Sequence, residues 1–490
     1  MAKKYLSKST FIKGVQCQKA LYLHKFNSDL ADEVSAQQQA VFDRGTNVGI
    51  LAQQLFPGGI DASPKDYTQY FQSFKYTQEL INNGTEVIYE AGFCVNHVMC
   101  FIDILVKENG RWHAYEVKSS TKVTDTYIID ASLQYYIMEK AGLDIADISI
   151  VYIDNSYVRS GELEIKKLFS SSLVTEHVTS NKDYVKNKLS ELHSILAMKS
   201  APVIDIGPHC GDPYDCNFKG HCWKGIPDYS IFDVSRLNKK IKWNLYNQGC
   251  IDIKHIPYDT PLSDNQKIEI DSYINQTEII HKIKIRDFVS SLSANIYHLD
   301  FETYQSAVPG FDSQKPYQQI PFQYSAHYEN KNGLKHYEFL AKNSLSDPRE
   351  EFIKNLINDM QQDGDILVYN ISFERSRLNE LIDMFPQYKT PLQAIIDRMK
   401  DLMIPFKEKW YYTPAMKGGY SIKYVLPALV PSLSYDDLEI NNGLLASATF
   451  NNLHKVKDLD ELKVIRKNLI EYCKRDTYAM VKVLDVLRSI

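Results

Sequence analysis

The sequence lacks long apolar runs, internal repeats and motor motifs. No stretch reaches the roughly 18 consecutive apolar residues of a membrane helix, so we expect no membrane span and no membrane partner. Residues 1–16 carry lysines but no apolar segment, so we expect no signal peptide. The Gly-x4-Gly-Lys-(Ser/Thr) signature is also missing, which excludes a P-loop motor within these residues.

Cysteine is scarce and the charge is nearly balanced. Only eight of the 490 residues are cysteine, which argues against a disulfide framework, favours metal binding where cysteines cluster, and predicts a cytoplasmic protein. The 56 Lys and Arg against 61 Asp and Glu give a net charge of −5. This excludes a basic coat over the whole surface but leaves room for a local basic groove.

Runs of β-branched and aromatic residues alternate with helical patterns, so we predict an α/β fold class. Strand-like stretches at 86–106 and 111–118 flank Asn109-Gly110, which is typical of a hairpin turn. Further strands and helices are predicted at 130–141, 148–153, 295–303, 365–369 and 458–487.

The length predicts about two to four domains. We place a first domain at 1–228 and a last domain at 294–490, joined by a charged helical connector at 229–293. The stretch 395–450 is dense in Pro and Gly and is interpreted as an insertion within the last domain.

Four cysteines are candidate metal ligands. Three follow a C-x5-C-x5-C spacing in a turn-rich segment, and the fourth lies near the amino end. They are Cys210, Cys216, Cys222 and Cys17. Four thiolates suit an iron–sulfur cluster or a zinc ion, to which His209 and His221 could add nitrogen ligands. The alternative is four unrelated buried thiols, which three cysteines within 13 residues of turn-like sequence argue against.

This cysteine pattern resembles the iron–sulfur RecB-like nucleases, in which one cysteine precedes the nuclease core and three follow it. The resemblance implies that Cys17, Cys210, Cys216 and Cys222 ligate a [4Fe-4S] cluster. The remaining cysteines lie in apolar or helical contexts and are expected to be packing residues.

A first group of carboxylates lies between these cysteines. Glu116 and Lys118 are two apart on a predicted strand and share a face, with Val117 on the other, while Asp103 lies across the hairpin. Two carboxylates bind a hard cation such as Mg²⁺, and a neighbouring lysine can steady a developing phosphate charge. Alternating charges on an exposed strand face would look the same.

Asp103 followed by Glu116-x-Lys118 is similar to the PD-(D/E)xK core of restriction-endonuclease-like nucleases. That resemblance implies catalytic roles for all three residues, with Asp103 and Glu116 as metal ligands. It also assigns Gln134 to the glutamine that helps to position nucleic acid. The histidine that related nucleases carry in their first helical motif is missing at the matching stretch, 44–49.

A second group of carboxylates lies in the last domain. Asp300 and Glu302 are two apart at the end of a predicted strand and share one face. Glu374 opens the helix that follows the next strand, and Tyr472 and Asp476 are four apart on the final helix. Four acidic residues that come from a strand and two helices fit a site for two metal ions. The alternative interpretation is that these are surface acids beside an ordinary helix tyrosine.

These segments resemble the DEDD family of 3′–5′ exonucleases, which have a ribonuclease H-like fold. Asp300-Phe301-Glu302 matches Asp-x-Glu, 370–374 matches Asn-x-x-(Phe/Tyr)-Asp with Glu374 in place of Asp, and 472–476 matches Tyr-x-x-x-Asp. The resemblance implies that Asp300, Glu302, Glu374 and Asp476 hold two Mg²⁺ or Mn²⁺ ions and that Tyr472 orients the attacking water.

The whole layout resembles an uncharacterised bacterial family that pairs a RecB-like module with a DEDD-like module. It implies a metal-dependent nuclease with a 3′–5′ exonuclease site and a second, RecB-like site, acting on DNA rather than RNA. A separate helicase could supply the missing motor. Two alternatives stay open: an RNA 3′ exonuclease whose RecB-like half only grips nucleic acid, and a non-catalytic iron–sulfur scaffold. Tyr420 and Lys423 could contact a nucleic-acid strand or belong to an ordinary surface turn.

Overall fold

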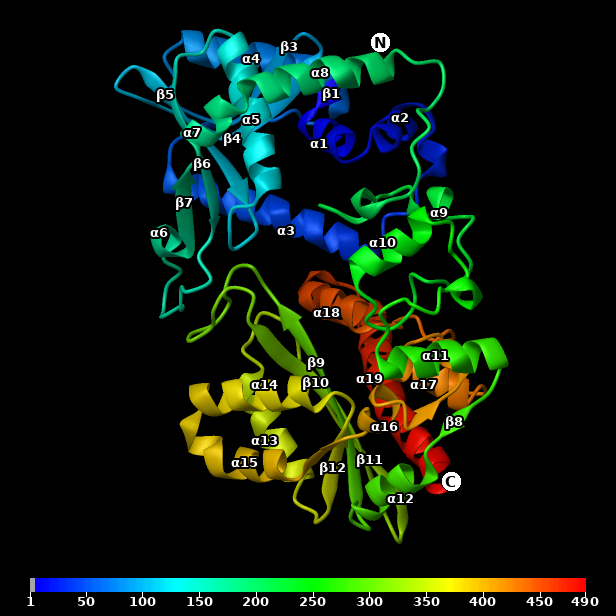
Figure 1. Ribbon diagram of the computed structural model, residues 1–490. Coiled ribbons are helices and arrows are strands. Elements are labelled where there is room, and N and C mark those ends of the chain that lie inside the picture. The colour runs from blue at the N-terminus through cyan, green and yellow to red at the C-terminus, as the bar shows by residue number, and fades with distance from the viewer. Residues whose placement is uncertain (1–4) are drawn as a thin grey trace. The chain divides into compact units, whose positions relative to one another are not determined.

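Each half of the chain builds its own mixed sheet with helices packed against it. The computed structural model describes residues 5–490 and divides them into two units (Figure 1). Unit 1 comprises the described residues up to Gly225 together with Ala307–Tyr317, and unit 2 comprises Ile226–Ser306 and Gln318–Ile490. The predicted α/β class is confirmed. No helix in the described part of the chain is long and apolar enough to cross a membrane.

Unit 1 is built on the sheet β2-β3-β4-β5-β6-β7, with β1 paired in parallel to β4. Its strands are β1 Leu6–Ser7, β2 Ile60–Asp61, β3 Val87–Val95, β4 Val98–Glu108, β5 Arg111–Lys118, β6 Ile145–Ile153 and β7 Phe169–Leu173. Its helices are α1 Lys8–Gln16, α2 Gln18–Phe26, α3 Ala36–Ala52, α4 Tyr70–Asn82, α5 Asp125–Lys140, α6 Ile165–Leu168, α7 Thr175–Ser180, α8 Lys182–Leu196 and α9 Lys219–Cys222. One core packs beneath α1, α5 and α8, and a second packs beneath α3.

The hairpin predicted at Asn109-Gly110 is confirmed, since Glu108 pairs with Arg111 across that turn. The strand-like stretch 86–106 is not continuous. Asn96 and His97 both adopt left-handed backbone conformations there, and they turn the chain between the antiparallel strands β3 and β4.

Unit 2 is built on the sheet β11-β10-β9-β12-β13, in which β9 pairs antiparallel with β10 and parallel with β12. Its strands are β8 Ile279–Ile280, β9 Ile296–Gln305, β10 Gln319–Asn330, β11 Gly333–Leu340, β12 Asp365–Val368, β13 Met399–Asp401 and β14 Tyr411–Tyr412. Its helices are α10 Lys239–Asn247, α11 Asp264–Asn275, α12 Lys282–Ser290, α13 Arg349–Asp359, α14 Ile371–Met384, α15 Lys389–Asp397, α16 Ile404–Lys407, α17 Ile422–Leu429, α18 Gly443–Asn452 and α19 Leu459–Arg488.

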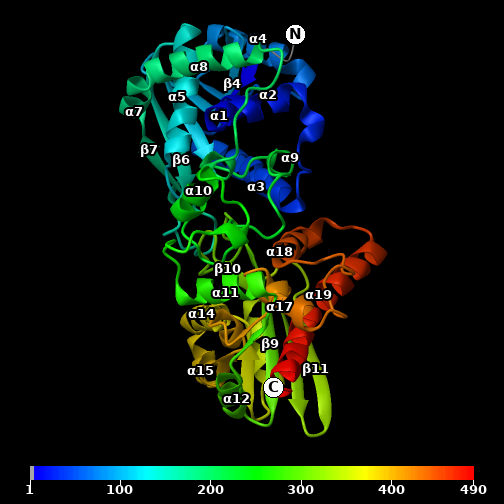
Figure 2. The ribbon, with the colours of Figure 1, turned by 45° about the vertical axis from the view of Figure 1, so that its right-hand side comes forward.

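The long helix α19 lies against one side of the unit 2 sheet, and α13–α15 lie on the other (Figures 1 and 2). Asp458 caps the start of α19 by accepting hydrogen bonds from the amides of Asp460 and Glu461. Buried residues recur every three or four positions along this helix, from Leu469 to Leu487, and they pack on β9 and β10. This packing brings the middle of α19 next to the acidic residues of β9.

Candidate functional site

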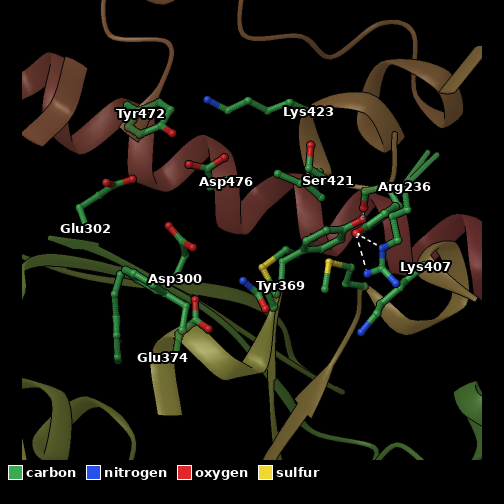
Figure 3. A pocket seen from close by; sticks show the side chains of 17 residues that line it. Arg236, Asp300, Glu302, Tyr369, Glu374, Lys407, Ser421, Lys423, Tyr472 and Asp476 are labelled. Atoms are coloured by element: carbon green, nitrogen blue, oxygen red, sulfur yellow. Dashed lines mark hydrogen bonds between the residues drawn. The ribbon is translucent and has the colours of Figure 1, made fainter. Parts of the chain in front are cut away.

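Four carboxylates from separate parts of unit 2 line one cavity of about 540 Å³. Asp300 and Glu302 come from β9, Glu374 from the first turn of α14, and Asp476 from α19. Figure 3 shows these side chains directed toward a common space, with Tyr472 of α19 above Glu302. The structure therefore brings together all five site residues predicted for the last domain.

The local backbone explains where the acids point. Phe301 lies between Asp300 and Glu302 and is buried on the opposite face of β9, where its ring contacts Phe352 of α13. Asn370 adopts a left-handed conformation at the start of α14, and the Asp401 carboxylate accepts hydrogen bonds from the amides of Asn370 and Ile371. The sharp start of α14 is stabilised in this way.

The four acids are held in an environment that disfavours negative charge. Burial, together with repulsion from Asp476, raises the pKa of Asp300 well above its usual range. Burial and the charge of Asp300 likewise raise the pKa values of Glu302 and Glu374. Burial raises the pKa of Asp476 to about 6, although a hydrogen bond from Tyr435 opposes the shift. A cation in the cavity would reverse these shifts.

Two tyrosines and a lysine surround the acids. Tyr435 Oη donates a 2.5 Å hydrogen bond to Asp476 Oδ1 and so orients that carboxylate. The Lys423 ammonium lies 5.3 Å from the ring centroid of Tyr435 and 5.2 Å from that of Tyr472. A Cβ at Gly443 would lie 3.4 Å from Glu302 Oε2 and 3.9 Å from Tyr472 Oη, so this glycine keeps the wall close to both groups without filling the space.

The opposite end of the cavity is basic and aromatic. Arg236 and Lys407 line it beside Tyr369 and Tyr420, and Arg236 donates hydrogen bonds from Nε and Nη2 to Tyr420 Oη (Figure 3). Sequence reasoning missed Arg236, Lys407 and Tyr435. Arg236 belongs to the stretch 229–293 that the sequence assigned to a connector, and this stretch is part of unit 2.

The acidic end of the cavity fits divalent cations. One ligand atom each from Asp300, Glu302 and Cys473 lie within 4.8 Å of one another. Glu374 is 1% exposed, and its Oε2 has no hydrogen-bond partner. Within residues 5–490, no lysine, arginine or histidine forms an ion pair with any of the four acids. Buried carboxylates without such partners are stabilised by binding a metal ion.

Part of this site lies within a family match. Residues 297–421 match the family "Domain of unknown function (DUF2779)". The matched stretch includes Asp300, Glu302 and Glu374 and ends before Tyr472 and Asp476. The chain is also similar to "Uncharacterized protein UU173" of Ureaplasma parvum serovar 3, with 29% identity over 288 residues. The matched region is 52% of this chain and spans 40% of the length of that relative.

In unit 1, the structure brings together the four cysteines predicted to bind a cofactor. All four line one small cavity, and none forms a disulfide. They are Cys17, Cys210, Cys216 and Cys222. Phe218, which is 1% exposed, packs beside them, and His209 lines the same cavity. Burial raises the pKa of the Cys17 and Cys216 thiols, and a bound metal would favour the thiolates. The donor set fits a cluster with four thiolate ligands.

The residues predicted for the first carboxylate site also lie together in unit 1. Lys118 Nζ is 2.6 Å from Glu116 Oε1, and the Gln134 amide donates a 2.6 Å hydrogen bond to Glu116 Oε2. Asp103 Oδ2 accepts a 2.6 Å hydrogen bond from the amide of Val117. Gln134 is fully buried, so in this structure it holds Glu116 in place.

Three further charged residues of this cluster were not predicted. Lys8 Nζ is 2.6 Å from Glu116 Oε1. Asp130 Oδ2, on α5, lies 2.6 Å from Lys118 Nζ. Glu90 of β3 has a left-handed backbone, and burial, opposed by Lys8, raises its pKa to about 7. Burial would also raise the pKa of Glu116, but the charges of Lys118 and Lys8 outweigh it and lower that pKa.

Proposed function

We propose that the unit 2 cavity is the active site of a metal-dependent nuclease that removes nucleotides from the 3′ end of DNA. Asp300, Glu302, Glu374 and Asp476 would hold Mg²⁺ or Mn²⁺. The observation that carries the proposal is the meeting of four acids around one cavity, where no lysine, arginine or histidine among the described residues forms an ion pair with them. The mixed sheet with helices on both sides is compatible with the ribonuclease H-like fold that the resemblance implies.

Divalent ions bound to these acids would supply the charge that activates water and stabilises the leaving oxygen. The chain's own residues would position the reactants. Burial and the charge of Asp476 raise the pKa of Tyr472, so its phenol stays protonated and can donate a hydrogen bond to a water molecule beside Glu302. Tyr435 keeps the Asp476 carboxylate in one orientation.

The opposite end of the cavity suits a nucleic-acid backbone. Phosphate groups are bound in proteins chiefly by arginine and lysine, and single strands are bound by such residues together with aromatic rings. Arg236 and Lys407 provide the positive charge there, and Tyr420 and Tyr369 provide rings on the same cavity wall. The cavity therefore offers acidic residues for metal ions at one end and basic and aromatic residues for the nucleic-acid backbone at the other.

For unit 1, we propose a [4Fe-4S] cluster held by Cys17, Cys210, Cys216 and Cys222. When bound, the cluster would connect the junction of α1 and α2 to the segment that contains the other three cysteines. Its contribution is structural, because it closes a loop of more than 190 residues between Cys17 and Cys210. Zinc is the competing occupant, with His209 as a further ligand.

The test uses anaerobically purified protein with Mg²⁺ or Mn²⁺ and end-labelled single-stranded DNA, duplex DNA and RNA. We expect shortening from the 3′ end that Asp300→Ala abolishes. Asp460→Ala is the matched control, because Asp460 is an exposed aspartate on the same helix as Asp476, and it should leave the activity unchanged. Equal shortening by the Asp300→Ala protein would remove the proposal.

The substrates separate the remaining alternatives. Degradation of RNA alone would favour an RNA 3′ exonuclease, and nucleic-acid binding without degradation would favour the non-catalytic scaffold. Activity on duplex DNA only when a helicase is added would identify the separate motor. We place this activity in the cytoplasm as part of the same proposal.

A further inference from the structure

The carboxylate cluster of unit 1 already contains two cations from the chain itself. Lys8 Nζ lies 2.6 Å from Glu116 Oε1 and 3.7 Å from Asp130 Oδ2. Lys118 Nζ lies 2.6 Å from the same two oxygens. Glu116 is 1% exposed, and the side chain of Asp130 is 7% exposed. Two ammonium groups therefore bridge the two buried carboxylates.

Contacts within this cluster engage both oxygens of Glu116 and one oxygen of Asp103, the two carboxylates that the nuclease resemblance assigns to a metal ion. Glu116 Oε1 accepts hydrogen bonds from both lysines, and Oε2 accepts one from Gln134, so both oxygens have a donor. Asp103 Oδ2 is engaged by the Val117 amide. The two buried oxygens of this cluster that lack a hydrogen-bond partner are on Asp130 and Gln134, which are not the predicted metal ligands.

The backbone holds Lys8 in this position. Lys8 is the first residue of α1, directly after Ser7, whose side chain caps the helix together with Thr10. Leu6 and Ser7 pair with β4, and Leu6 is fully buried. A cation at a helix N-terminus is unfavourable, so the contacts with Glu116 and Asp130 must offset this cost. Lys8 thus reaches the cluster from a fixed anchor.

The two carboxylate clusters of this protein differ in their ion pairs. In unit 2, Asp300, Glu302, Glu374 and Asp476 form no ion pair within residues 5–490. In unit 1, Glu116 and Asp130 are both paired. A divalent ion would have to displace Lys8 from two carboxylates, leaving a partly buried ammonium without its partners, which is unfavourable.

We propose that Lys8 takes the place of the divalent cation in unit 1, so that this site is not a second hydrolytic centre. The residues present therefore do not fit the metal that the nuclease resemblance implies for Asp103 and Glu116. Lys8 instead fixes the start of α1 to β5 and α5 as an internal counterion. This inference concerns unit 1 alone and holds whether or not unit 2 is a nuclease.

The test measures Mn²⁺ uptake by the full chain, with its cysteine site loaded, from the electron paramagnetic resonance signal of free Mn²⁺. Asp300→Asn and Asp476→Asn are present throughout, to disable the unit 2 cavity. With Lys8 intact, adding Glu116→Gln should leave Mn²⁺ uptake unchanged. If Lys8-intact protein binds one Mn²⁺ per chain that Glu116→Gln abolishes, the proposal is overturned.

A second arm replaces the lysine. Lys8→Met should create a site for one Mn²⁺ per chain, and Glu116→Gln should remove it again. Lys182→Met is the matched control, because Lys182 pairs with Glu139 at the surface of the same unit, and it should create no site. A folded Lys8→Met protein, judged by circular dichroism, that binds no Mn²⁺ would overturn the assignment. If Lys8→Met does not fold, the first arm decides alone.

Discussion

Divalent cations should stabilise unit 2, and the stabilisation should grow as the pH rises. Without a cation, the folded state holds protons on Asp300, Glu302, Glu374 and Asp476, whose pKa values are raised by burial. The unfolded chain releases these protons near the usual values of 3.8 for Asp and 4.5 for Glu. Because the folded state binds more protons, the metal-free protein loses stability as the pH rises through these folded pKa values.

The size of this loss of stability can be worked out for one of the four carboxylates, Asp476. The pKa of Asp476 is about 6 in the folded state against 3.8 normally, which corresponds to about 3 kcal/mol of stability that is present below about pH 4 and lost above about pH 6. A bound cation stabilises the ionised carboxylates and so offsets this loss of stability. At a concentration of 100 times its Kd, a ligand contributes about 2.7 kcal/mol. For a unit of about 250 residues, this raises Tm by roughly 5–10 °C.

The assay is thermal unfolding followed by circular dichroism, with EDTA or with excess Mg²⁺ or Mn²⁺, near pH 5 and near pH 8. We expect a small increase in Tm at the lower pH and the full increase at the higher pH. The double variant Asp300→Asn, Asp476→Asn should melt higher than the wild type in EDTA at the higher pH and should lose its response to the cation. Asp460→Asn is the exposed control. An equal cation response in the double variant would refute the reasoning.

Three further predictions concern other parts of the protein. Cys216→Ser should remove the visible absorption of an iron–sulfur cluster, whereas Cys94→Ser should not. Colourless wild-type protein with stoichiometric zinc would contradict the cluster. Arg236→Ala should weaken binding of single-stranded DNA and lower its salt dependence by about one phosphate contact, whereas the exposed control Lys389→Ala should not. Unchanged binding by the Arg236→Ala protein in a filter assay would contradict the phosphate role. Glu116→Gln should lower the free energy of unfolding, measured in urea, by about 3–5 kcal/mol, because it leaves two partly buried ammonium groups with one carboxylate. A loss below about 1 kcal/mol would show that the ion pairs contribute little.

Local periodicity in the sequence was enough to predict several parts of the candidate site. Alternation along a strand places Asp300 and Glu302 on one face, and one helical turn places Tyr472 above Asp476 on another element. The Asn-Gly turn of the unit 1 hairpin was predictable for a different local reason, because it requires a backbone conformation that few residues adopt.

Which distant charges meet could be seen only once the helices and strands were packed together. Lys8 and Glu116 are 108 residues apart, and no spacing in the sequence connects them. Arg236 lies in a stretch that resembles a connector, yet it lines the cavity of Asp300. Contacts of this kind leave no periodic pattern, because they depend on how whole elements pack. That packing leaves one carboxylate cluster open to a cation and closes the other with a lysine.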